Sequence, residues 1–231
     1  DDVIDRHSAR LAAMAGDLLD LSRIQSSGTA PQPTTLELSG VLRSLRERFA
    51  EAVQAKGLHF QVDWEPVAQR TIVASRHLLN LVLDNLVDNA IQFTEPGGHV
   101  RVVCRVAAEF VTFEVTDDGC GIPEADQERV FERFYQVERA RSGVRRGTGL
   151  GLAIVRDAVA AMRGSVGLQS RVGAGTTVTV TLPQPAGRKV FEVPAGAKAP
   201  DIQKAIDEAA KLKGQRPVVH VPAGKYPLGG G

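Results

Sequence analysis

Gly147-Thr-Gly149-Leu-Gly151 is the most informative stretch of the sequence for the fold. It leads into a predicted helix, from about Leu150 to Met162. Glycines at such a place free several backbone N–H groups to converge on an anion, and the N-terminus of the helix adds about half a positive charge. The stretch favours a phosphate-binding loop, and tight loop packing is its alternative. Four basic residues lie just upstream: Arg139, Arg141, Arg145 and Arg146. They are predicted to form a lid over the phosphates, with a solvated loop as the other interpretation.

The segment from about 35 to 183 alternates between helical and strand patterns. One helix, predicted to be capped by Ser39 and ended by Gly57, carries an apolar stripe of Val41, Leu42, Leu45, Phe49 and Val53. The next, capped by Ser75 and closed by Pro96-Gly97-Gly98, carries Leu78, Val82, Leu86, Ala90 and Phe93. Strands are predicted over Leu58–Trp64, 99–107, 110–116, Ser165–Ser170 and Thr176–Leu182. The predicted fold class is α+β, a two-layer α/β sandwich in which three helices cover one face of a mixed sheet.

The composition is that of a globular protein of one ordinary domain with flanking pieces, or of two small domains, since 231 residues are 43% hydrophobic. The formal net charge of +1 gives no global reason to expect nucleic acid or an anionic membrane as partner. Cys104 and Cys120 are too far apart for a zinc pair and too few for a disulfide framework, which suits a reducing cytoplasm. No run approaches the ~18 apolar residues of a membrane span. We therefore expect a cytoplasmic fragment without membrane contact; a membrane sensor of the parent protein, if there is one, would lie outside it.

Three further segments stand at spacings that allow them to meet the glycine stretch: Asn85-Leu-Val-Asp-Asn89, Asp117-Asp-Gly119-Cys-Gly121 and Gly173-Ala-Gly175-Thr176. Asn85 and Asn89 are four residues apart, so both amides project from one side of a helix. Taken alone, the asparagine pair is better explained as surface polarity, and Asp-Asp-Gly as a turn after a strand. The coincidence of all four segments in one chain favours a single nucleotide pocket.

Together the four segments resemble the N, G1, G2 and G3 boxes of the ATP-binding domain of sensor histidine kinases, a superfamily that includes DNA gyrase, Hsp90 and MutL. Phe131-Glu-Arg-Phe134-Tyr135 lies between the second and third boxes, where histidine kinases carry an F box that gyrase-type relatives lack. The resemblance implies that ATP and Mg²⁺ bind here and that the γ-phosphoryl group is transferred to a histidine. It implies the following nucleotide contacts: Asn85, Asn89, Phe93, Asp117, Gly119, Gly121, Ile122, Phe134, Arg146, Gly147, Thr148, Gly149, Leu150, Gly151 and Thr176.

The resemblance also implies individual roles. Asn89 matches the magnesium ligand, and an amide oxygen suits that hard cation. Asn85 stands where gyrase-type ATPases place a glutamate that activates water, and an amide cannot take up that proton. Asp117 matches the carboxylate that accepts a hydrogen bond from the adenine amine and so selects ATP over GTP. Two departures, Gln92 for a frequent lysine and Gln136 for a frequent arginine, remove cations from the phosphate region and predict lower affinity or rate.

The flanks complete the predicted organisation. Residues 1–27 resemble the second helix of a dimerisation hairpin, 28–34 a linker, 35–185 the catalytic domain and 186–231 the truncated start of a pectate-lyase-like β-helix, or else a small helix–strand appendage. His7 does not match the phosphoacceptor motif, so we expect the acceptor helix to be absent from this chain and the fragment to be inactive in autophosphorylation. The implied partners are the protein's own hairpin, a response-regulator receiver domain and a second copy in a homodimer.

Two other functions remain open from the sequence. In the first alternative, the chain is a non-catalytic, nucleotide-binding module for regulation or dimerisation. In the second, it is part of a carbohydrate-active β-helix protein whose site lies beyond the last residue. Intact nucleotide-binding segments argue against the first, and the short length of the tail argues against the second, because a solenoid needs several stacked coils to bury a core.

Overall fold

The structure is a computed structural model that describes residues 16, 19, 22, 33–64, 67, 70–107, 109–137, 148–184, 190–192, 199–211 and 218–220. The chain divides into two compact units, Asp1–Pro183 and Gln184–Gly231. In the part described, the first unit contains the strands β1 (Thr34–Glu37), β2 (His59–Asp63), β3 (Thr71–Ala74), β4 (His99–Val106), β5 (Phe110–Asp117), β6 (Ser165–Arg171) and β7 (Gly175–Pro183). Its helices are α2 (Leu38–Lys56), α3 (Arg76–Phe93) and α5 (Gly151–Ala161), with the 3₁₀ turns η2 (Glu124–Asp126) and η3 (Arg129–Phe131).

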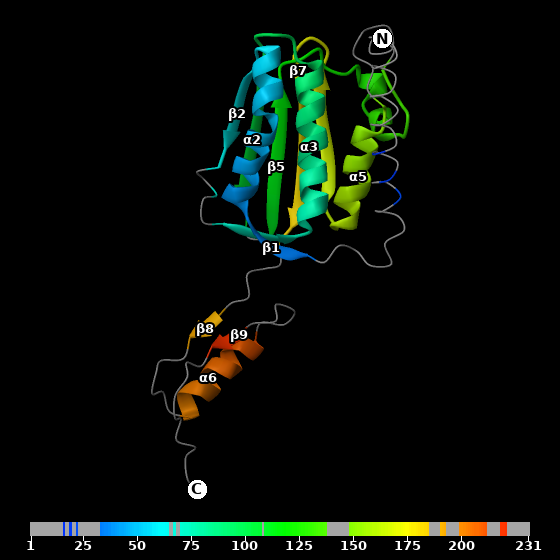
Figure 1. Ribbon diagram of the computed structural model, residues 1–231. Coiled ribbons are helices and arrows are strands. Elements are labelled where there is room, and N and C mark those ends of the chain that lie inside the picture. Colours follow the sequence, from blue (N-terminus) through cyan, green and yellow to red (C-terminus); the bar gives the residue numbers. More distant parts are fainter. Residues whose placement is uncertain are drawn as a thin grey trace. The chain divides into compact units, whose positions relative to one another are not determined.

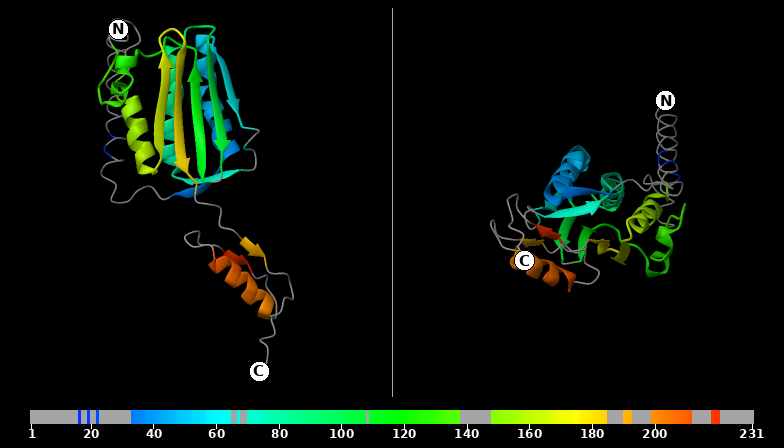
Figure 2. Two further views of the ribbon diagram at one scale, coloured as in Figure 1. Left: turned by 180° about the vertical axis from the view of Figure 1, so that it is seen from behind. Right: turned by 90° about the horizontal axis from the view of Figure 1, so that it is seen from below.

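Five strands form one mixed sheet in the order β2-β4-β5-β7-β6. The β2–β4 pair is parallel and the other pairs are antiparallel. The three helices α2, α3 and α5 all lie on one face of this sheet, and none of the helices in the described part of this unit lies on the opposite face (Figures 1 and 2). The predicted α+β class, with three helices over one face of a mixed sheet, is confirmed.

The core lies between the helices and the sheet. Alternate residues of β5, Val111, Phe113 and Val115, are buried, as are Leu79 and Leu83 of α3. The period of two on the strands and the period near four on the helix direct these side chains into the same layer. The apolar patterns read from the sequence therefore correspond to packed surfaces.

The helix boundaries follow local chemistry at most ends. The Ser75 hydroxyl accepts the backbone N–H of Leu78 (3.3 Å), so the predicted cap of α3 is confirmed. Gly57 ends α2 with a left-handed φ of 66°. The predicted Ser39 cap is wrong: α2 begins at Leu38 with Glu37 at the N-cap position. The reason is tertiary, because the Leu38 N–H donates to the carbonyl of Arg70 (3.0 Å) and is satisfied without a side-chain cap.

The antiparallel pair of β1 and β3 was not assigned from the sequence. Each strand has only four residues, and the pairing partner lies more than thirty positions away (Thr34 opposite Ala74). Short strands of this kind have no pattern strong enough to separate them from loop. Their pairing delivers the chain directly into α2 and α3.

The second unit contains β8 (Val190–Glu192), α6 (Ala199–Ala210) and β9 (Val218–His220), and β8 pairs with β9 in parallel. The predicted short amphipathic helix is confirmed, while β8 was not predicted. The resemblance of this tail to a β-helix remains a prediction, since one strand–helix–strand unit does not distinguish a solenoid start from an appendage.

The predicted N-terminal helix and His7 lie almost wholly outside the described residues, and of that range Gly16, Leu19 and Ser22 are helical. None of the helices in the described ranges combines the length and apolar character needed to cross a membrane.

Candidate functional site

Helix α3 presents Asn85, Asn89 and Phe93 at intervals of four residues, so they share one side of the helix. The Asn85 side-chain N–H donates to the carbonyl of Leu81 (2.8 Å), and the side-chain oxygen of Asn85, Oδ1, lies near the start of α5. A Cβ placed on Gly151 would lie 3.0 Å from Asn85 Oδ1 and 3.3 Å from Asn89 Nδ2. The first turn of α5 and the two asparagines therefore meet across a gap that a glycine leaves open.

The loop before α5 is tied to the phenylalanine-rich segment. The Phe134 N–H donates to the carbonyl of Gly149 (2.8 Å), and Gly149 has a φ of +74°. A Cβ on Gly149 would lie 2.8 Å from the carbonyl carbon of Phe134. Phe134 itself has a positive φ of 64° and a side chain that is 58% exposed. A large apolar residue is therefore held on the surface in a backbone conformation that is uncommon for residues other than glycine.

Thr148 and Leu150 complete the described part of this loop. The Leu150 N–H donates to Thr148 Oγ1 (3.1 Å), and the Leu150 side chain is fully buried. Arg146 and Gly147, with the three other basic residues of the predicted lid, lie outside the described residues.

At the other end of the site, Asp117 is the last residue of β5 and pairs with Thr176 on β7. Its carboxylate accepts the backbone N–H of Gly119 (2.9 Å). Gly119 packs against α3, since a Cβ there would lie 2.5 Å from the carbonyl oxygen of Phe93. Gly175 has a φ of +96°, and its Cβ would lie 1.9 Å from the carbonyl oxygen of Asp117. Only glycines allow these segments to approach so closely.

Gly121 and Ile122 join this end of the site to β6. Gly121 has a φ of +68°, and a Cβ on it would lie 2.0 Å from the carbonyl oxygen of Arg171. The Ile122 N–H donates to Ser170 Oγ (2.8 Å). Together with the approach of Gly175 to Asp117, these contacts pack the second sequence segment against the fourth and against the end of β6, which their spacing allows.

The two neighbouring aspartates have opposite electrostatic character. Burial raises the pKa of Asp117 to about 6, against the backbone N–H groups of Gly119 and Thr176, which lower it. The pKa of Asp118 is lowered, first by the backbone N–H of His99 and then by the His99 ring. Asp118 consequently fixes the loop after β5 to His99 on β4, whereas the carboxylate of Asp117 is poorly solvated.

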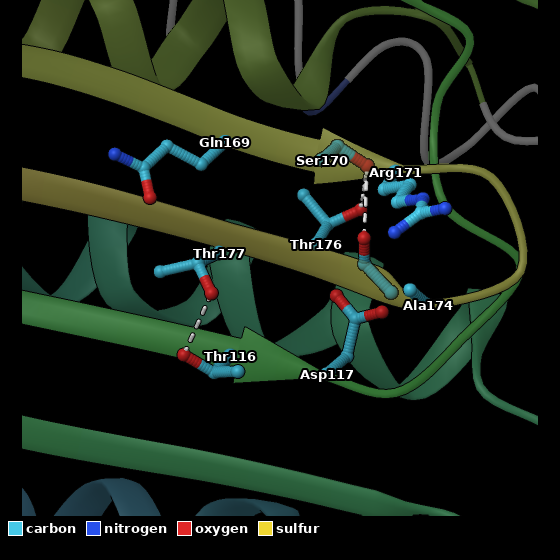
Figure 3. A pocket seen from close by; sticks show the side chains of 9 residues that line it. Thr116, Asp117, Gln169, Ser170, Arg171, Ala174, Thr176 and Thr177 are labelled. Carbon is cyan, nitrogen blue, oxygen red and sulfur yellow. Dashed lines mark hydrogen bonds between the residues drawn. The ribbon is translucent and has the colours of Figure 1, made fainter.

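A cavity of about 310 Å³ opens at the ends of β5, β6 and β7 (Figure 3). Its lining contains two predicted contacts, Asp117 and Thr176. Gly175, a third lining residue, belongs to the fourth predicted segment, and the remaining six were not predicted as contacts: Thr116, Gln169, Ser170, Arg171, Ala174 and Thr177. The available signal was the pairing of the two predicted strands, which places Ser170 opposite Thr176.

The arrangement suits a nucleotide. The N-terminus of α5 meets the amide groups of Asn85 and Asn89 on α3, and the half-buried carboxylate of Asp117 lies beyond the end of α3. Because Gly151 has no Cβ, the space between the start of α5 and the two asparagine side chains stays open for a group of a ligand. Among the described residues, no cluster of three His, Cys, Asp or Glu side chains is arranged to hold a metal ion.

Residues 74–186 match the family of histidine kinase-, DNA gyrase B- and HSP90-like ATPases. This part of the chain is a domain of that family, the ATP-binding catalytic domain found in sensor histidine kinases. The chain is similar to the sensor-like histidine kinase SenX3 of Mycolicibacterium smegmatis, with 37% identity over 77% of this chain and 46% of that protein. It thus spans less than half the length of this relative.

Two solved structures are similar in fold. The nucleotide-free catalytic domain of histidine kinase ThkA matches with a TM-score of 0.58 and 25% identity, over 66% of this chain and 98% of that one. Full-length ShkA in complex with AMPPNP matches with a TM-score of 0.65 and 25% identity, over 92% of this chain and 46% of that one.

Proposed function

We propose that this chain binds ATP with Mg²⁺ at the site described and transfers the γ-phosphoryl group to a histidine on a dimerisation hairpin. The observation that carries the proposal is the meeting of the α5 N-terminus with Asn85 and Asn89 at Gly151. Phosphoryl transfer depends mainly on positioning and on charge neutralisation. A helix N-terminus beside two amide oxygens supplies both requirements at one place.

Asn89 is proposed as the protein ligand of the magnesium ion. Its amide lies beside Gly151, with Nδ2 3.3 Å and Oδ1 3.8 Å from the position of a Cβ there. Magnesium usually keeps several waters and takes its other ligands from substrate phosphates, so one amide oxygen is sufficient from the protein.

Asn85 is proposed to contact the nucleotide without acting as a base. Its N–H group is engaged with Leu81 and its oxygen belongs to an amide, which does not take up a proton at neutral pH. The site therefore lacks a water-activating carboxylate at this position, and bound ATP is held for transfer rather than hydrolysed rapidly.

Asp117 is proposed to accept a hydrogen bond from the exocyclic amine of adenine, with Thr176 beside it. The proposed contacts around the base and the phosphates are Phe93, Gly119, Gly121, Ile122, Phe134, Arg146, Gly147, Thr148, Gly149, Leu150 and Gly151. Of these, Phe134 is proposed to cover the base, and its exposure and its hydrogen bond to Gly149 of the glycine loop support this role.

Residues 1–27 are proposed to form the second helix of a dimerisation hairpin in a homodimeric, cytoplasmic part of the parent protein, with 28–34 as linker and 35–185 as the catalytic domain. A response-regulator receiver domain is the proposed next acceptor. The likeness in fold to ThkA, which has been solved in complex with the response regulator TrrA, supports this kind of partner.

The test has two parts. Titration calorimetry with ATP, in the presence and absence of Mg²⁺, is expected to show Mg²⁺-dependent binding that Asp117→Ala abolishes. Asp63→Ala is the matched control and is expected to leave binding unchanged. Asp63 lies on β2, and its carboxylate pairs with the exposed Arg101 on β4 (2.7 Å). Radiolabelled ATP is then supplied together with a separately prepared hairpin that carries the acceptor histidine.

Labelling of the hairpin is the expected result. ATP binding without labelling would favour a non-catalytic regulatory module, and a complete lack of ATP binding would refute the proposed nucleotide site.

A further inference from the structure

Ser170, near the end of β6, contacts two other segments of the chain through one hydroxyl group, and Figure 3 shows its position beside Thr176. Its Oγ accepts the backbone N–H of Ile122 (2.8 Å) and donates to the carbonyl of Gly175 (3.0 Å). It also lies 2.8 Å from Thr176 Oγ1. The serine therefore contacts the loop after β5 and the first two residues of β7 at the same time.

The direction of the Ser170–Thr176 hydrogen bond follows from a count of protons. A hydroxyl has one proton and two lone pairs, and a carbonyl only accepts. Because the single proton of Ser170 goes to the Gly175 carbonyl, Ser170 has only lone pairs left for its other neighbours. Thr176 must then donate its own proton to Ser170, and the lone pairs of Thr176 Oγ1 are left for another donor.

Thr176 stands directly beside Asp117 across the β5–β7 ladder, and its backbone N–H bonds to the Asp117 carboxylate. Both residues line the cavity of about 310 Å³. The ionised Asp117 carboxylate has acceptors only. The cavity wall consequently presents two adjacent acceptors, which match a group that bears N–H donors and oppose a carbonyl oxygen in the same place.

We propose that Ser170 is a positioning residue that fixes the Thr176 hydroxyl as an acceptor and thereby sets the preference of the site for an amino-bearing purine, an inference that rests on the proposed function. Ser170 does not itself contact the base. It acts through Thr176 and, by its bond to Ile122, through the loop that follows Gly121.

Gln127 also holds the same loop. Its side-chain amide donates to the carbonyl of Ile122 (3.1 Å) and to the carbonyl of Ser170 (2.8 Å). These bonds do not involve the Ser170 hydroxyl, so Gln127 still links Ile122 of the loop to the Ser170 carbonyl of β6 when the hydroxyl is removed. Loss of the Ser170 hydroxyl is therefore expected to change the polarity of Thr176 more than the position of the loop.

The experiment uses the full 231-residue chain and compares ATP with inosine triphosphate, in which a carbonyl replaces the purine amine. Dissociation constants are measured by calorimetry for ATP and by displacement of labelled ATP for inosine triphosphate. The variants are Ser170→Ala, Ser170→Cys and Ser170→Thr, with Ser165→Ala as the control on the exposed start of the same strand. Melting temperatures are measured in parallel to separate folding from selectivity.

In Ser170→Ala the Thr176 proton is free to turn into the cavity, so the ATP-to-inosine-triphosphate preference is expected to fall at least fivefold. Ser170→Cys is expected to do the same with a smaller loss of stability, because a thiol fills the space but is a weak donor and acceptor. Ser170→Thr is expected to restore the preference, and Ser165→Ala to leave it unchanged.

A preference that stays within twofold of the unsubstituted chain in both Ser170→Ala and Ser170→Cys would overturn the inference, even if both variants melt at lower temperature. Failure of the unsubstituted chain to bind ATP would instead refute the proposed function itself.

Discussion

Asp117→Asn is expected to stabilise the free protein at alkaline pH and to weaken ATP binding. The substitution removes a carboxylate that burial makes difficult to ionise and that the proposed function needs in its ionised form. An asparagine of the same shape keeps an oxygen for the backbone N–H groups of Gly119 and Thr176. The change therefore separates the cost of the buried charge from the rest of the local structure.

The magnitude follows from the pKa of Asp117. Its value is about 6 in the folded protein against an ordinary value of 3.8. Because the folded value is the higher one, the stabilisation from the neutral carboxyl is complete below about pH 4 and is lost as the pH rises through about 6. The loss amounts to about 3 kcal/mol at pH 8, with roughly half of it already present at pH 5.

The assay is urea unfolding of both proteins between pH 5 and pH 8 without nucleotide. Asp117→Asn is expected to be more stable at pH 8, by about 1 to 3 kcal/mol, and its advantage is expected to shrink toward pH 5. Calorimetry is expected to show at least a tenfold loss of ATP affinity in the variant, since hydrogen bonds to charged groups contribute about 1.5 to 3 kcal/mol. ATP affinity of the unsubstituted protein is expected to decrease below pH 6, while that of the variant stays flat.

An advantage of Asp117→Asn that is equal at pH 5 and pH 8 would show that the Asp117 carboxyl does not titrate in this range. A variant less stable than the unsubstituted protein at pH 8 would show that its hydrogen bonds outweigh the cost of burying the charge. Either result refutes the reasoning.

Three further substitutions probe the packing of the site. Gly175→Ala is expected to cost about 3 kcal/mol or more in urea unfolding, because φ is +96° and the new Cβ would lie 1.9 Å from a backbone oxygen. Gly167→Ala, with nothing within 4 Å of its Cβ, is the control and should change stability by less than about 1 kcal/mol. Phe134→Ala is expected to lower ATP affinity at least fivefold in calorimetry with little change in melting temperature, because the ring is 58% exposed; unchanged affinity would remove Phe134 from the site. Gly151→Ala is expected to weaken ATP binding about tenfold and to change stability by less than about 1 kcal/mol, because its Cβ would meet an asparagine amide at 3.0 Å; equal losses in affinity and stability would indicate a packing defect alone.

Much of the fold was predictable because its elements carry strong local patterns. The stripe of α3, the Ser75 cap and the alternation in β4 and β5 are properties of neighbouring residues, and the structure has them at nearly the predicted boundaries. The β1–β3 pair and the start of α2 were missed for the opposite reason. Leu38 begins a helix because Arg70 supplies an acceptor from a distant segment, and no local signal reports such a contact.

The site divides in the same way. The sequence by itself determined the chemistry available at the four segments. It supplies glycines where a Cβ would not fit, and amide and carboxylate side chains that can contact a nucleotide. Only the tertiary structure decided how they work together. It left Asp117 half-buried and Asp118 exposed, although the two are neighbours, because the first accepts backbone N–H groups of Gly119 and of Thr176 on β7, while the second pairs with exposed His99. It also placed Ser170 opposite Thr176 and directed their hydrogen bonds, since burial and pairing between strands depend on segments that are distant in the chain.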